Sequence, residues 1–317
     1  MFHERVLVEP LSVITQSLPS DVVVLERGWL SSNTIVLLGA DPVVIDTGHH
    51  RHAEQLLALL EHWLGEQHPQ RLLNTHLHSD HCGGNARLQA RWPQLLTLIP
   101  HCVFEATKEW SPSRLPFEST GQNCPRFAVH AALRGGQEII LNGRTWEIHE
   151  CPGHDADGVL FFEPRERILI SADALWENGF GVLFDALESE FGFDAQEQTL
   201  NLIESLHARW VLPGHGRAFQ SVKPSIARAR SRLAHWRQHP LSHAEHAAHV
   251  LIKFHVMVHQ NLALQEFMSW ADQVSLLKRI HAQDPRGIEF EAWLLERLDV
   301  LCAKKAVQLT PQGVLDA

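Results

Sequence analysis

One segment constrains this chain more than any other. HLHSDH follows directly on Leu72–Thr75, a short apolar run that predicts a strand. Residues two apart at a strand end project to the same side, so His76 and His78 can reach one metal ion. Asp80 and His81, on the turn that follows, can face a second ion. The pattern therefore favours a fold that gathers metal ligands at this strand end, and a solvated histidine-rich loop is the alternative.

Further candidate ligands follow other predicted strands. His154 and His215 each end a Pro-Gly-His segment, after the predicted strands Arg144–Glu150 and Trp210–Leu212. Glycine lets the backbone turn sharply there, which places each imidazole at a sheet edge. Asp173 ends an apolar run that reads as a buried strand, where a carboxylate is costly unless it is paired or binds metal. Together with HLHSDH, these residues predict a metal site rather than isolated turns.

The first two-thirds of the chain alternate between short predicted strands and helices. Apolar runs bounded by turns predict strands at Val22–Leu25, Thr34–Leu38, Val43–Ile45 and Ile168–Ile170. After about residue 222 the pattern changes to helices at 223–239, 244–260, 265–281 and 290–302, with a terminal hairpin at 306–315. We therefore expect an α/β catalytic domain over 1–222 and a helical module over 223–317.

Composition limits the environment and the partners. No run of 18 apolar residues and no basic, apolar leader occurs among the 317 residues, so we expect no membrane contact. A net charge of −10 argues against nucleic acid as a partner. The five cysteines are an odd number with no CxxC pair, which favours a reduced, cytoplasmic protein. A small-molecule substrate is the partner that we expect, and a homodimer is one option for assembly.

The chain resembles the metallo-β-lactamase superfamily, in particular its glyoxalase II-like hydrolases. The resemblance covers residues 20–220 and implies a four-layer αββα sandwich with metals at one edge. It implies two ligand groups bridged by Asp173, and an Asp46 that orients a ligand histidine rather than binding metal. By position, the first group is His76, His78 and His154, and the second is Asp80, His81 and His215. The C-terminal helices resemble the winged-helix appendage of some members of this superfamily.

The ligand types imply the chemistry. Nitrogen and oxygen ligands suit two divalent ions, Zn²⁺ first and Fe²⁺ or Mn²⁺ as alternatives. A metal-bridging hydroxide would attack an ester, thioester or lactone carbonyl. Asp80 and Asp173 are the carboxylates that we assign to catalysis, with Asp80 or a bound water protonating the leaving group. Trp176, Glu177, Asn178 and Phe180, after the bridging acid, are expected to line an apolar pocket with one acid.

Departures from the family leave the substrate open. Glyoxalase II enzymes hold glutathione with tyrosine and basic residues, yet this chain contains no tyrosine. Asp155-Ala156-Asp157 follows His154, where serine or threonine is common in the family. Two other chemistries of the same fold remain as alternatives: a mononuclear iron enzyme similar to persulfide dioxygenases, and a metal-dependent phosphodiesterase or ribonuclease.

Overall fold

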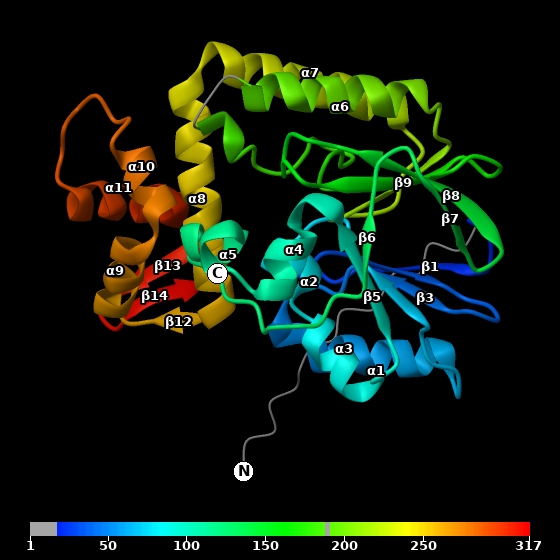
Figure 1. Cartoon of the computed structure of the whole chain (residues 1–317). Helices are drawn as coiled ribbons and strands as arrows, with labels where there is room; N and C mark the ends of the chain where they lie inside the picture. Colours follow the sequence, from blue (N-terminus) through cyan, green and yellow to red (C-terminus); the bar gives the residue numbers. More distant parts are fainter. Residues whose placement is uncertain (1–17, 188–190) are drawn as a thin grey trace.

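The computed structural model, which describes residues 18–187 and 191–317, places two β-sheets face to face (Figure 1). The first sheet has the strand order β1-β2-β3-β4-β5-β6. Its antiparallel part, β1 to β3, passes into a parallel part, β3 to β6. The bounds are β1 Val22–Leu25, β2 Thr34–Leu37, β3 Val43–Ile45, β4 Arg71–Leu73, β5 Leu96–Pro100 and β6 Ala131–Leu133.

The second sheet has the order β11-β10-β9-β8-β7. Asn142 and Gly143 connect β7 to β8 with φ angles of 46° and 74°, the left-handed backbone that a tight hairpin turn requires. Within this second sheet, β10 and β11 are the one parallel pair, and α6 (Phe191–Ser205) makes the crossover between them. The bounds are β7 Glu138–Leu141, β8 Arg144–Glu150, β9 Val159–Glu163, β10 Ile168–Ala172 and β11 Trp210–Pro213.

The side chains of each strand alternate between the two faces of its sheet, and this alternation builds the layers of the sandwich. Successive strand residues point to opposite faces, so Val159 and Phe161 of β9 face the first sheet, and Leu160 and Phe162 face the helices. Helices α1 (Ala53–Leu64) and α3 (Asn85–Arg91) cover the outer face of the first sheet, whereas α6 and α7 (Val222–Gln238) cover that of the second (Figure 1). The expected αββα sandwich is therefore confirmed.

The C-terminal region forms a separate hydrophobic core. Its long helix α8 (Pro240–His259) lies beside the sandwich, and α10, α11, β12 and β14 pack on that helix (Figure 1). A small sheet with the order β12-β14-β13 closes this module. The remaining bounds are β12 Asn261–Leu262, α9 Leu264–Gln273, α10 Ser275–His281, α11 Phe290–Ala303, β13 Val307–Thr310 and β14 Gly313–Asp316.

Helix α7 packs against the sandwich rather than within the C-terminal core. Ile226, Ala229, Leu233 and Trp236 are buried in the hydrophobic cluster outside the second sheet. A helical C-terminal region is present as expected, and the boundary near residue 222 stays a prediction. Among the described helices, none combines the length and the hydropathy needed to cross a membrane.

Candidate metal centre

The predicted ligands meet because each follows the carboxyl end of a strand. His76 follows β4, His154 follows β8, Asp173 follows β10 and His215 follows β11. The glycine of the second Pro-Gly-His segment is required by this crowding: a Cβ on Gly214 would lie 2.1 Å from Oδ1 of Asp173. Local strand-to-loop turns thus bring residues from both sheets to one edge of the sandwich.

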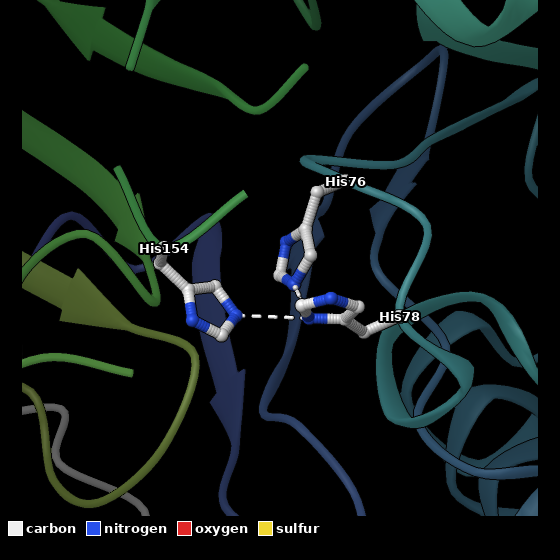
Figure 2. Close-up of side chains that lie close together, drawn as sticks. All are labelled: His76, His78 and His154. Carbon is white, nitrogen blue, oxygen red and sulfur yellow. Dashed lines mark hydrogen bonds between the residues drawn. The ribbon is translucent and has the colours of Figure 1, made fainter. Parts of the chain in front are cut away.

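Three histidines form the first potential ligand group. Nδ1 of His78 lies 3.1 Å from Nε2 of His76 and 2.9 Å from Nε2 of His154, and the three rings turn toward one another in Figure 2. His154 Nδ1 lies 2.7 Å from the carbonyl oxygen of Val182, which can only accept, so Nδ1 carries the proton and Nε2 is left with its lone pair. Asp155, the departure from the family, has its carboxylate 3.8 Å from Nε2 of His78, on the other side of that ring.

Asp80, His81 and His215 form a second group. The short helix α2 (Ser79–Cys82) carries Asp80 and His81, and Oδ2 of Asp80 lies 3.1 Å from Nε2 of His215. Asp173 stands between the groups: its carboxylate oxygens lie 3.5 Å from Nε2 of His81, 3.5 Å from Nε2 of His154 and 3.7 Å from Nε2 of His215.

Asp46 fixes the ring of His81. Its Oδ2 accepts a hydrogen bond from His81 Nδ1 at 2.8 Å, and the backbone and hydroxyl of Thr75 donate to the same carboxylate. A carboxylate only accepts, so the proton of His81 lies on Nδ1. Nε2 of His81 is buried, has no hydrogen-bond partner among the described residues, and faces the carboxylates of Asp80 and Asp173.

The charges of the site favour metal ligation. Burial, followed by the neighbouring histidines, lowers the pKa of His76 well below its usual value and that of His154 to about 4, so both rings are neutral at pH 7. Burial would also lower the pKa of His81, but the carboxylates of Asp173, Asp46 and Asp80 raise it well above its usual value. These carboxylates attract a cation to His81, and a proton or a metal ion would satisfy them.

A cavity of about 750 Å³ opens beside these groups. All four residues predicted to line a pocket lie on its wall, namely Trp176, Glu177, Asn178 and Phe180. Trp176 Nε1 donates a hydrogen bond to Oδ1 of Asp173 at 3.1 Å. Helix α8 and the end of α11 form the opposite wall, which exists only once the C-terminal module packs against the sandwich.

Trp29 is a further residue at the site. Its ring stacks on His215 with centroids 5.4 Å apart and meets Trp176 edge-on, although 62% of Trp29 is exposed. A large apolar ring is normally buried. An exposed tryptophan stacked on a candidate ligand therefore indicates the cavity mouth, and only its place in a loop rich in Gly and Ser could have suggested this from sequence.

Comparison with known proteins agrees with this geometry. The family model described as the metallo-beta-lactamase superfamily matches residues 27–215, which is more than half of the chain. The chain belongs to the metallo-beta-lactamase superfamily. Among curated members, a hydroxyacylglutathione hydrolase of Synechococcus sp. (strain CC9605) is 28% identical over 120 residues, covering 36% of this chain and 41% of that protein. An atrochrysone carboxyl ACP thioesterase of Aspergillus fumigatus is 27% identical over 200 residues, covering 62% and 54%.

Solved structures of the superfamily share the fold. A metallo-beta-lactamase family protein from Thermus thermophilus is 18% identical with a TM-score of 0.54, covering 93% of this chain and 98% of that one. The curated relatives are matched over about half of their length. These relatives are named as a hydrolase and a thioesterase, and the histidine and aspartate cluster of this chain is suited to divalent metal.

Proposed function

We propose that this protein is a dinuclear metal-dependent hydrolase of an ester, thioester or lactone carbonyl. The observation that carries the proposal is the convergence of six side chains around Asp173. His76, His78 and His154 would hold one ion, and Asp80, His81 and His215 the other, with Asp173 between them. Zn²⁺ suits these nitrogen and oxygen ligands, and Fe²⁺ and Mn²⁺ are the alternatives.

The surroundings of His81 show that the site suits a cation. Its Nε2 is buried, without a hydrogen-bond partner in the described part of the chain, and faces two carboxylates that attract positive charge. A divalent cation between these atoms would satisfy all three. When bound, such ions lower the pKa of water toward neutrality and polarise a carbonyl oxygen.

The chain's own residues supply position and proton control. Asp46 holds a proton of His81 on Nδ1, and Val182 holds that of His154 on Nδ1, so Nε2 of each ring is the atom that can bind an ion in the site. Trp29 and Trp176 cover His215 and restrict water on that side. Asp80 lines the cavity, and its carboxylate, or a bound water, would accept the proton released by the attacking water and pass it to the leaving group.

Metal content and a substrate panel test the proposal. We expect about two divalent ions per chain and turnover of esters, thioesters or lactones. Asp173→Ala should lose the second ion and most turnover, and full activity in that variant would refute the two-metal assignment. One iron per chain with oxygen uptake would instead favour the dioxygenase alternative, and cleavage of phosphodiesters alone would favour the nuclease alternative.

The environment and assembly of the protein are part of the same proposal. A cytoplasmic, reducing location is supported by the odd number of cysteines and the lack of a CxxC pair. A homodimer stays a prediction, which light scattering of the purified chain would test.

A further inference from the structure

The cavity beside the candidate metal centre has a long wall supplied by α8. His246, Val250, Phe254 and Met257 all line it, and these four residues recur at helical spacing along one face. At a rise of 1.5 Å per residue, this face extends about 16 Å. The face is apolar at Val250, Phe254 and Met257, whereas His246 makes its N-terminal end polar.

Basic side chains gather on this part of the cavity. Arg217, Arg232, Lys253 and Lys304 line it. Lys253 is neutralised, since its Nζ lies 2.5 Å from Oδ1 of Asp316. Within residues 18–187 and 191–317, the other three basic side chains form no ion pair with a carboxylate. These three side chains therefore present uncompensated positive charge to the cavity.

Arg232 differs from the other arginines of α7. Arg228 donates to the carbonyl oxygen of Glu177, while Arg230 and Arg237 pair with carboxylates of α6. Arg232 instead lies over the ring of Trp236 at 5.6 Å. It approaches the loop after Asp173 so closely that a Cβ on Gly179 would lie 2.4 Å from its Nη1.

Arg232 and Lys304 line the same cavity as His246, and the charges of both act on that histidine. Burial, followed by the charges of Arg232, His249 and Lys304, lowers the pKa of His246 to about 4, so this ring is neutral at pH 7. His249 also lines the cavity, and its Nε2 is buried without a hydrogen-bond partner in the part of the chain that the structure describes. Two cations and two neutral imidazoles thus form a site rich in hydrogen-bond donors.

We propose that Arg232, Lys304, His246 and His249 form a subsite for an anionic group of the substrate. Resting on the proposed hydrolase function, this assigns the substrate as an amphipathic ester or thioester. An apolar segment along Val250, Phe254 and Met257 separates its carbonyl from a carboxylate or a phosphate. Paired charges would not select such a group, whereas unpaired cations beside donor imidazoles do. The pocket expected from sequence, apolar with one acid, is therefore completed by Arg232 of α7 and by Lys304, which follows α11.

Matched thioesters test the subsite. One set shares a hexanoyl group and varies the end of the thiol part, which is a carboxylate, a phosphate monoester or a neutral carboxamide. A second set carries the same three groups at the far end of the acyl chain. In one of the sets, kcat/KM of the metal-loaded enzyme should be about tenfold higher for an anionic member than for the neutral one. Comparing carboxylate with phosphate identifies the anion.

Substitution assigns the preference to these residues. In the double variant Arg232→Gln/Lys304→Gln, the ratio of anionic to neutral kcat/KM should fall to about one. Lys305→Gln removes a charge from the exposed neighbouring residue, which does not line the cavity, and should retain the preference. Thermal unfolding of each variant establishes that it is folded. Equal kcat/KM for anionic and neutral members of both sets, or an equal loss in Lys305→Gln, overturns the subsite.

A binding measurement separates this inference from the proposed function. Hydrolysis of the neutral thioesters tests the hydrolase alone. If no thioester is cleaved, calorimetry with thioether analogues, in which CH₂ replaces the carbonyl, still decides the subsite. The anionic thioether should bind about tenfold more tightly than the neutral one, and the double variant should abolish this difference. Equal dissociation constants in the wild type refute the subsite.

Discussion

Replacing Asp46 with asparagine tests how His81 is prepared to bind metal. The carboxylate accepts hydrogen bonds from Thr75 N at 2.9 Å, Thr75 Oγ1 at 2.7 Å and His81 Nδ1 at 2.8 Å. Asparagine has the same shape, but its amide nitrogen only donates. A bond to His81 through that nitrogen requires Nδ1 to accept, which moves the proton of the imidazole to Nε2 and removes the lone pair that faces Asp80 and Asp173.

The magnitude follows from these contacts. We expect the affinity of the second ligand group for Zn²⁺ to fall about 10- to 100-fold, the usual effect of removing the partner of a ligating histidine. One buried donor loses its acceptor, which should lower the free energy of unfolding by about 1–3 kcal/mol. The first ligand group, which Asp46 does not contact, should keep its affinity.

Calorimetric titration of Zn²⁺ into the metal-free protein measures both steps, and thermal unfolding measures the loss of stability. Asp41→Asn is the matched control, because Asp41 is exposed in the turn before β3 and the chemical change is identical. Wild-type affinity at both steps in Asp46→Asn would refute the role of Asp46 in fixing His81. An equal loss in Asp41→Asn would attribute the effect to net charge.

Two further predictions concern stability. Removing metal with a chelator should lower the free energy of unfolding by about 3 kcal/mol for each ion held at a free concentration one hundred times its dissociation constant, and chelator-independent unfolding would contradict metal binding. His243, buried between Phe193 and Trp236, has its pKa lowered by burial to about 4. The unfolded chain therefore binds more protons between about pH 6.5 and 4, so this residue reduces stability as the pH falls, by about 2 kcal/mol between pH 7 and pH 5. His243→Leu should remove that part of the acid sensitivity in denaturant unfolding at the two pH values, and an unchanged difference would refute it.

Strong local patterns predicted most of the sandwich. Val22–Leu25 and Val43–Ile45 are strands at the predicted bounds, because β-branched runs between turns favour extended backbone. The 265–281 helix, by contrast, is interrupted at Val274, whose ψ is 101°. Neither glycine nor proline marks that break, at which Val274 is buried in the C-terminal core. Strands β5 and β6 were not predicted. For β6, the run Ala131–Leu133 is too short to show the two-residue alternation of a strand.

The sequence alone determined which residues can bind metal and that they follow strand ends, because the two-residue period of a strand and the turn at Pro-Gly are local properties. It also determined the resemblance to the superfamily, which the family model confirms over residues 27–215. Only the tertiary structure decided which nitrogen of His81 carries its proton, since Asp46 lies 35 positions away along the chain. The cationic wall of the cavity was decided in the same way. Arg232, His246 and Lys304 line one cavity only when α7, α8 and α11 pack together, and no local pattern encodes that packing.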